Sequence, residues 1–346
     1  MSSTTQTPNF IHRGSVRVDL LGGTIDIYPI NHILENVVTL NAALSLQAEV
    51  EIKESKGKYI TIISEDYDTE IKLEHKANWN QQKLEKPQFR FVIEIIESFK
   101  IPHPVTITLR SGAPTGSGLG GSSSMGVTLL QAISLYFKQE IPRDQIIRTV
   151  QNLESRQLNK GVPGYQDYHP ALYGGILALV PEYDRVRVDQ LYSEKLGDFL
   201  KGHCSLYYSN HSRFSGINNW EVFKQFFDDD GSTRTGLQQI ADLSQKAFET
   251  IKALNYSQLI ELMVEEGQVR SALFDKIITN EIRNFIQDCD DLIQGYKMCG
   301  AGGGGCFLVF HSPDKSSEVE DIAKKHGMAK LDFEILPPLE NEGFAQ

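Results

Sequence analysis

Residues 114–124 read PTGSGLGGSSS, a glycine- and serine-rich run between a strand-like and a helix-like segment. Apolar and polar residues alternate just before it, over Val105–Arg110, and an apolar run typical of a helix follows over Met125–Phe137. Glycines let a backbone approach an anion closely, and the first N–H groups of a helix have no partner within the helix. Serine hydroxyls can bind phosphate oxygens or a metal ion. The pattern therefore predicts a phosphate-binding loop and favours a nucleotide-binding enzyme.

Two familiar nucleotide-binding patterns fit this loop poorly. Gly116 and Gly121 have the glycine spacing of a Walker A loop, but Ser122 stands where that motif needs a lysine. Gly116, Gly118 and Gly121 formally match the dinucleotide fingerprint, which also needs an acidic residue at the end of the next strand. Glu140 lies at the right distance, but it follows a helix-like segment. A tight turn that serves only packing is the remaining alternative for an isolated loop of this kind.

The length and composition exclude several classes of protein. The chain has 346 residues, which favours two domains, and its net charge of −11 argues against general binding to nucleic acid. No apolar run approaches the roughly 20 residues needed to span a membrane, and residues 1–9 carry no signal-peptide pattern. We therefore expect a cytoplasmic protein with neither a nucleic acid nor a membrane as partner. The four cysteines lack the spacing of a zinc site and are predicted to be reduced thiols: Cys204, Cys289, Cys299 and Cys306.

The rest of the chain mixes strand and helix patterns without a strict repeat, which predicts an α+β fold. Strands are expected at 46–52, 59–63, 105–110, 176–180, 204–208 and 306–310, and helices at 89–99, 125–137, 146–154, 235–254, 256–272, 279–295 and 314–327. The first two strands, joined by Lys56-Gly57-Lys58, are expected to form a hairpin. A charged region at 185–203 predicts a domain boundary. The acidic run Asp228–Asp230 lacks the spacing of a calcium loop and is expected to be solvated.

Four segments together resemble the GHMP kinases, named for galactokinase, homoserine kinase, mevalonate kinase and phosphomevalonate kinase. Pro114–Ser124 resembles the second family motif, Pro-x-x-x-Gly-Leu-Gly-Ser-Ser, with Gly121 in place of the first serine. Arg17–Asp26, which reads RVDLLGGTID, is similar to the first motif, and Lys297–Cys306 is similar to the third. Val162–Asp167 resembles the segment that carries the catalytic aspartate. These segments span residues 17–306 in the order that the family has them.

The resemblance implies a fold and an activity. The fold would be the two-domain GHMP kinase fold, with an N-terminal nucleotide-binding α/β domain at 1–200 and a C-terminal ferredoxin-like α+β domain at 201–346. The protein would use ATP and Mg²⁺ to phosphorylate a hydroxyl of a small-molecule sugar or sugar phosphate, as a monomer or a homodimer. Gly23-Thr24, in place of the usual Glu-His, resembles the D-glycero-D-manno-heptose 7-phosphate kinase branch.

A heptose-7-phosphate 1-kinase-like activity is therefore the leading expectation. The alternatives are a galactokinase-like kinase of a free monosaccharide or uronic acid, and a catalytically inactive family member that binds or regulates. Mevalonate kinase is less favoured, because its first motif usually has lysine where Arg17 stands and lacks the pattern around Asp26.

The resemblance also assigns roles to individual residues. Asp167 would accept the proton of the substrate hydroxyl, and Arg17 beside it would stabilise negative charge. Ser122 and Glu154 would hold the metal, with Ser123 as the alternative ligand. The ATP phosphates would contact the loop residues Pro114, Gly116, Ser117, Gly118, Leu119, Gly120, Gly121, Ser122, Ser123 and Ser124. The substrate would contact Gly23, Thr24, Asp26, Arg213 and Gly303, with the Asp26 carboxylate accepting sugar hydroxyls and Arg213 binding a phosphate.

Overall fold

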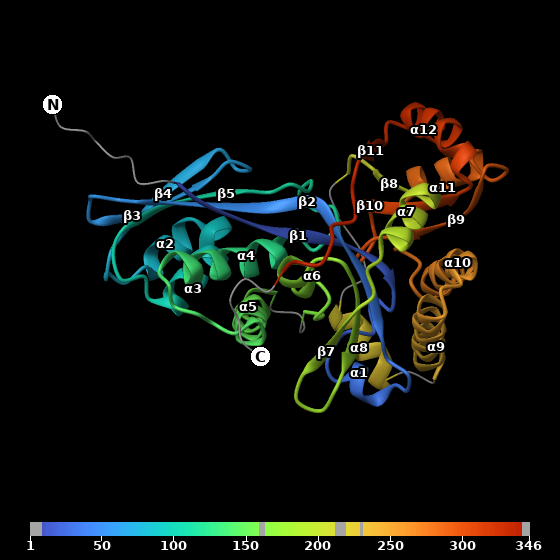
Figure 1. The fold of residues 1–346 in the computed structure, drawn as a ribbon, viewed down its shortest axis with the longest axis horizontal. Coiled ribbons are helices and arrows are strands. Elements are labelled where there is room, and N and C mark those ends of the chain that lie inside the picture. The colour runs from blue at the N-terminus through green and yellow to red at the C-terminus, as the bar shows by residue number, and fades with distance from the viewer. Residues whose placement is uncertain (1–8, 159–162, 212–218, 229–230, 341–346) are drawn as a thin grey trace.

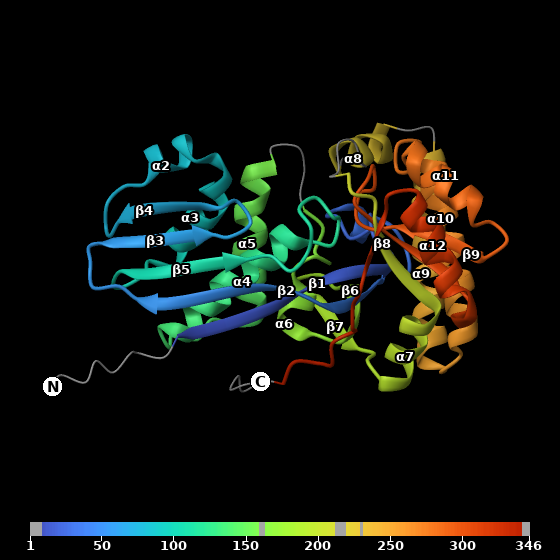
Figure 2. The ribbon, with the colours of Figure 1, turned by 90° about the horizontal axis from the view of Figure 1, so that it is seen from above.

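The computed structural model describes residues 9–158, 163–211, 219–228 and 231–340. They form a mixed α+β molecule with one β-sheet toward each end (Figures 1 and 2). Within the described residues, no helix combines the length and the apolar character that crossing a membrane requires. All four cysteines are buried free thiols.

The larger sheet carries a layer of helices on one face (Figure 1). Its strands are β1 (Phe10–Leu21), β2 (Thr39–Glu54), β3 (Tyr59–Ser64), β4 (Thr69–Glu74), β5 (Val105–Arg110), β6 (Ile176–Pro181) and β7 (Val186–Gln190). They lie in the order β4-β3-β5-β2-β6-β7, and β1 also pairs with β2. The covering helices are α2 (Asn80–Glu85), α3 (Arg90–Phe99), α4 (Gly121–Tyr136), α5 (Arg143–Leu158) and α6 (His169–Tyr173). Apolar residues of α3, α4, α5 and α6 and of β2, β3, β4 and β5 form one buried cluster.

The hairpin predicted for the strands at 46–52 and 59–63, which are β2 and β3 in the structure, is wrong. β5 lies between β2 and β3, antiparallel to β2, where Ile52 faces Ile107, and parallel to β3, where Ile62 faces Ile107. The four residues 55–58 can span the roughly 10 Å that an intervening strand requires, since neighbouring strands lie about 4.8 Å apart. Ile107 thereby joins Ile52 and Ile62 in the buried cluster. Alternation in the sequence indicates a strand, but it does not indicate which strand lies beside it.

The smaller sheet has the order β11-β8-β10-β9, and all its neighbours are antiparallel. Its strands are β8 (Cys204–Tyr208), β9 (Ile293–Met298), β10 (Cys306–His311) and β11 (Ala329–Leu331). The helices of this half are α7 (Glu194–His203), α8 (Asn219–Asp228), α9 (Ser232–Lys252), α10 (Tyr256–Leu273), α11 (Asn280–Asp288) and α12 (Ser316–Lys325), and α1 (Ile30–Ile33) lies in the first half of the chain. The helix predicted for 279–295 ends at Asp288, because the chain then turns to form the edge strand β9. Gly295 of that strand has no room for a side chain, since a Cβ there would lie 2.6 Å from Val264.

The two sheets share a buried core. Leu20 and Leu40 of the larger sheet belong to the same apolar cluster as Leu206 and Leu308 of the smaller one. The strands of the two sheets separate between residues 190 and 204, and the division into domains 1–200 and 201–346 stays a prediction.

The C-terminal segment returns to the larger sheet, where the Leu336 N–H donates to the carbonyl of Ala43 (2.9 Å). Of the acidic run, Asp229 and Asp230 lie outside the described residues.

Candidate active site

The glycine–serine loop lies between β5 and the start of α4. Gly116, Gly118 and Gly120 have φ angles of 72°, 78° and 75°, in the left-handed region that favours glycine. α4 begins at Gly121, four residues earlier than the sequence pattern predicts, so all three serines lie in its first turn. The N–H groups of residues 121–123 have no acceptor within the helix, and the helix dipole adds positive potential there. The loop and the helix start therefore form an anion-binding site.

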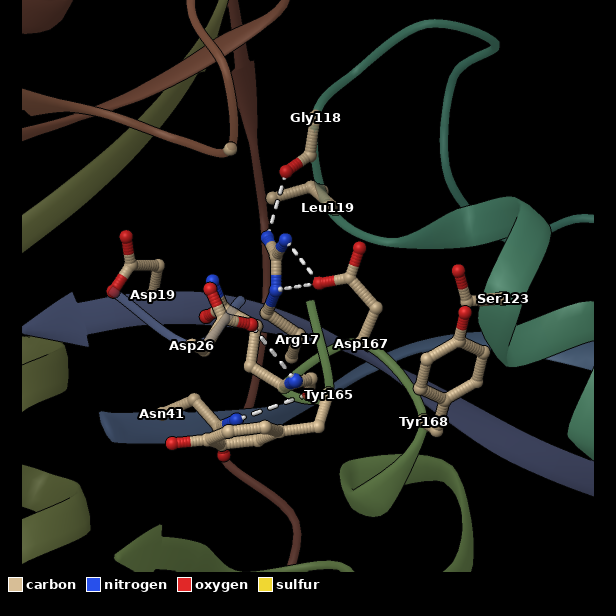
Figure 3. Close-up of polar contacts among 12 residues, drawn as sticks. Arg17, Asp19, Asp26, Asn41, Gly118, Leu119, Ser123, Tyr165, Asp167 and Tyr168 are labelled. Atoms are coloured by element: carbon tan, nitrogen blue, oxygen red, sulfur yellow. Dashed lines mark hydrogen bonds and ion pairs between the residues drawn. The ribbon is translucent and has the colours of Figure 1, made fainter. Parts of the chain in front are cut away.

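Arg17 of β1 joins this loop to Asp167 (Figure 3). Its Nε donates to Asp167 Oδ1 (2.8 Å), its Nη2 donates to the same oxygen, and its Nη1 donates to the carbonyl of Gly118 (2.7 Å). The backbone N–H of Arg17 donates to the carbonyl of Leu119 (3.1 Å). The Arg17 side chain is 3% exposed, whereas that of Asp167 is 29% exposed. A buried cation thus holds a carboxylate that remains open to the cleft.

Arg17 remains positively charged although its side chain is buried. Burial alone would lower its pKa, but the negative charges of Asp167 and Asp19 outweigh burial and raise the pKa above its usual value. The guanidinium is therefore a permanent cation beside Asp167.

One cleft of about 520 Å³ brings these groups together, a volume typical of small-molecule sites. Most of the predicted nucleotide-binding residues line it, together with Arg17, Glu154 and Asp167. Leu119 and Ser124 do not: Leu119 is buried in the apolar core, and the Ser124 hydroxyl donates to the carbonyl of Ser15 (2.9 Å). Sequence reasoning left the base-binding end open within residues 59–100, and the cleft includes Tyr67, Phe89, Phe91 and Val92 from that range.

Glu154 lies inside α5, not at its end as predicted, because the helix continues to Leu158. Glu154 is 9% exposed, and its Oε2 accepts from the Ser123 hydroxyl (2.8 Å) and from the Tyr168 hydroxyl (2.7 Å). Burial raises the pKa of Glu154, and these hydrogen bonds offset that rise only in part. Among the described residues, no cationic side chain forms an ion pair with Glu154. A buried carboxylate beside serine hydroxyls is an oxygen donor set that suits Mg²⁺.

Asp26 is buried close to Asp167 and Arg17 (Figure 3). Its Oδ2 accepts from the N–H of Gln166 (3.1 Å). Burial, and next the charge of Asp167, raise the pKa of Asp26 to about 7. Asn41 of β2 donates from Nδ2 to the carbonyl of Gln166 (3.2 Å) and so supports the segment that leads to Asp167. Sequence reasoning missed Asn41, which is polar and fully buried between Leu40 and Ala42 of β2.

The turn after β1 is tightly constrained. A Cβ on Gly23 would lie 2.1 Å from the Oδ2 of Asp19, so any larger residue there would displace the buried Asp19 side chain. Thr24 has a φ of 80°, which is a strained conformation for a β-branched residue. Such strain is typical of functional sites, where the surrounding structure holds it in place.

The glycine-rich segment at residues 299–306 packs directly on the glycine–serine loop. The N–H of Cys306 donates to the carbonyl of Ser117 (2.7 Å). A Cβ on Gly118 would lie 2.7 Å from the carbonyl oxygen of Cys299, and a Cβ on Gly300 would lie 2.7 Å from that of Gly118. The two loops therefore touch backbone to backbone.

None of the predicted substrate-binding residues lines this cleft in the described part of the chain. Gly23, Thr24 and Asp26 are absent from its wall, and Asp26 instead lines a separate pocket of about 270 Å³. The Gly303 N–H donates to the carbonyl of Ile277 (2.8 Å), and Gly303 is absent from the cleft wall that the described residues form. Arg213 lies outside the described residues. Their contact with substrate stays a prediction.

This packing makes Gly118→Ala a sharp test of the loop. The new methyl group would meet the Cys299 carbonyl at 2.7 Å, and alanine is strained at a φ of 78°. Because the loop must then shift, we expect the KM for ATP, the nucleotide that the resemblance implies, to rise about tenfold, equivalent to about 1.4 kcal/mol. Steady-state kinetics would measure it. Gly121→Ala is the matched comparison, since a Cβ there meets nothing within 4 Å, and a change in KM as large as that of Gly118→Ala would contradict the argument.

Comparisons with known proteins bear on this geometry. Residues 89–175 match the family model described as "GHMP kinases N terminal domain". The chain is 25% identical to a mevalonate kinase of Saccharolobus solfataricus over 294 residues, 82% of this chain and 86% of the relative. It is also 25% identical to a D-glycero-alpha-D-manno-heptose 7-phosphate kinase of Campylobacter jejuni over 339 residues, 95% of each chain. The crystal structure of Methanococcus jannaschii mevalonate kinase matches with a TM-score of 0.74 at 18% identity, over 97% of this chain and all of that one. The match over the whole chain confirms the predicted α+β fold.

Proposed function

Because this chain belongs to the GHMP kinase family of ATP-dependent kinases, we propose that it phosphorylates a hydroxyl of a sugar phosphate, with the C1 hydroxyl of a heptose 7-phosphate as the leading acceptor. The observation that carries the proposal is the Arg17–Asp167 pair at the wall of the phosphate-binding cleft. Phosphoryl transfer depends on positioned phosphates, an oriented hydroxyl and stabilisation of charge. The cleft offers a group for each of these tasks.

The side chains divide the chemistry between them. The backbone N–H groups of the loop and of the first turn of α4 bind the ATP phosphates. Asp167 orients the acceptor hydroxyl and accepts its proton, and its exposed fraction leaves it accessible to a substrate. Arg17 holds Asp167 in place and stabilises the negative charge that develops on the attacking oxygen.

The fit of a metal rests on Glu154 and the serine hydroxyls beside it. Ser122 or Ser123 would hold Mg²⁺ together with Glu154, and the only partly compensated burial of that carboxylate favours a cation at this point. Bound there, the ion would neutralise phosphate charge.

The acceptor class follows from the charges around Arg17. Asp167 lines the cleft, the buried Asp26 lies close to it, and carboxylates accept hydrogen bonds from hydroxyl groups. A polyol therefore suits this end better than a small carboxylate such as mevalonate, which would meet like charges. Mevalonate phosphorylation is the second candidate, because the similar proteins include mevalonate kinases at the same level of identity.

A substrate panel tests the proposal. ATP turnover would be measured with D-glycero-D-manno-heptose 7-phosphate, free heptose, galactose, galacturonate and mevalonate, and mass and NMR analysis would locate the phosphate. We expect the highest kcat/KM with the heptose 7-phosphate and a product phosphorylated at C1. Preference for mevalonate would overturn the sugar proposal. No turnover with any acceptor, and no difference from Asp167→Ala, would favour a binding or regulatory protein.

The metal ligand can be identified with single serine variants. We expect Ser122→Ala to raise the Mg²⁺ concentration for half-maximal rate on the order of tenfold, with little change in metal-free nucleotide binding, because a lost ligand weakens only the metal. If Ser123→Ala has this effect instead, the ligand is Ser123, whose hydroxyl already contacts Glu154. Ser124→Ala is the control, since that hydroxyl bonds to the β1 backbone. An unchanged Mg²⁺ dependence in both variants would remove the serines from the metal site.

A further inference from the structure

Four charged side chains lie buried together behind the cleft, each at most 2% exposed. They are Asp19 of β1, Glu266 and Arg270 of α10, and Lys297 of β9. Lys297 pairs with Glu266, and its Nζ also lies 3.5 Å from the Oδ2 of Asp19. The Nη1 of Arg270 lies 3.4 Å from the same oxygen. Two acids thus balance two bases, and the group joins three elements of the fold.

Arg270 differs from the other three in what else it binds. Its Nη1 donates to the carbonyl of Met298 (3.1 Å), and its Nη2 donates to that of Gly300 (2.5 Å). Met298 is the last residue of β9, directly before the glycine loop of residues 299–305, and Gly300 lies within that loop. Gly300 also packs on Gly118 of the phosphate loop. The Lys297 ammonium, in contrast, forms its ion pairs within the described ranges with Asp19 and Glu266.

Buried ion pairs contribute little net stability compared with apolar residues of the same size. A guanidinium can, however, fix two acceptors at once through its rigid planar fork. The contacts of Arg270 with two successive parts of one loop use this geometry. A core that needed only balanced charge would not require those contacts.

We propose that Arg270 is a positioning residue, which holds residues 299–305 against the phosphate loop and thereby sets the affinity for ATP. This inference rests on the proposed function, in which the phosphate loop binds ATP. Arg270 itself lies away from the cleft and acts through the two packed backbones.

Two charge-neutral double variants separate positioning from general core stability. Asp19→Asn with Arg270→Met removes the ion pair together with the two carbonyl contacts. Glu266→Gln with Lys297→Met removes the other ion pair, equally buried, and keeps those contacts. Each variant leaves one complete acid–base pair in the core. Asp19→Asn alone, which also keeps both carbonyl contacts, controls for the change in β1.

We would measure binding of a non-hydrolysable ATP analogue by calorimetry and turnover by steady-state kinetics. Amide hydrogen exchange would report the opening of residues 115–124. We expect the Asp19/Arg270 variant to bind the analogue at least tenfold more weakly and to exchange faster over 115–124. The Glu266/Lys297 variant and Asp19→Asn should bind within about threefold of wild type. Arg270→Lys keeps the charge but cannot bond both carbonyls in one plane, so we expect an intermediate loss of affinity even if the double variant fails to fold.

Equal weakening in both double variants would overturn the inference, since it would indicate a general effect of the core. Unchanged binding in the Asp19/Arg270 variant, or full affinity in Arg270→Lys, would overturn it while leaving the proposed function intact. If the wild-type protein itself does not bind the analogue, the proposed function fails and this inference with it.

Discussion

Replacing Asp167 by asparagine should lower kcat by about a thousandfold while the affinity for ATP changes less than threefold. General-base help is worth roughly 10²- to 10⁴-fold, and an amide cannot accept the proton. Asparagine has the same shape and can still accept a hydrogen bond from Arg17, so the contact of Arg17 with Gly118 should persist. The loss should therefore fall on the chemical step. Single-turnover kinetics, together with calorimetric titration of an ATP analogue, would separate chemistry from binding.

The control for Asp167→Asn is Asp189→Asn, which affects an Asp–Arg pair within strand β7. Asp189 pairs with Arg187 at 2.6 Å and lies outside the cleft wall. Asp189→Asn should leave kcat within twofold, because surface ion pairs contribute little. A thermal melt of each variant would establish that it is folded. If Asp167→Asn retained more than a tenth of the wild-type kcat, Asp167 would not be the base.

The parts of the site that could be predicted from the sequence are those that need one residue type at one position. Glycines with positive φ, such as Gly118 and Gly120, are recognisable because other residues are strained there. Arg17 and Asp167 were paired only through the family resemblance, since 150 residues separate them and no local pattern joins them. The structure places them in contact.

The parts that could not be predicted depend on contacts distant in sequence. Glu154 looks like a surface carboxylate in its helix, and only the packing of α4 against α5 makes it buried. The place of β5 between β2 and β3 is set by which apolar faces complete the core. Arg270 and Lys297 have no sequence signal that distinguishes a core charge from a surface one. Burial is a property of the assembled fold, so local patterns do not carry it.

The buried carboxylate of Asp26 affects both the stability of the fold and the proposed activity. Burial and the nearby Asp167 raise the pKa of Asp26 to about 7. In the unfolded chain an aspartate titrates near 3.9. Between about pH 4 and pH 7 the folded protein therefore holds a proton that the unfolded chain has released, so this group's contribution to stability falls as the pH rises. Above pH 7 this difference between the pKa values of the folded and unfolded states destabilises the fold by about 4 kcal/mol.

Asp26→Asn should consequently stabilise the fold and impair the enzyme. The amide oxygen can still accept the Gln166 N–H, and no buried charge forms, so we expect the free energy of unfolding to rise by about 2–4 kcal/mol at pH 8 and by much less at pH 4. Since the carboxylate is proposed to accept acceptor hydroxyls, kcat/KM for the acceptor should fall about a hundredfold with the KM for ATP unchanged. Urea unfolding at both pH values and steady-state kinetics would measure the two effects.

The two effects of Asp26→Asn need a control and can each fail separately. Asp198→Asn, at an exposed position of α7, should produce neither. Destabilisation by Asp26→Asn at pH 8 would mean that the carboxylate is compensated in the fold, contrary to its raised pKa. Stabilisation with full activity would remove Asp26 from acceptor binding and leave its burial without a catalytic reason. A gain in stability together with the loss of activity would identify Asp26 as a residue that is kept for function although it destabilises the fold, because burial favours the neutral amide over the charged carboxylate.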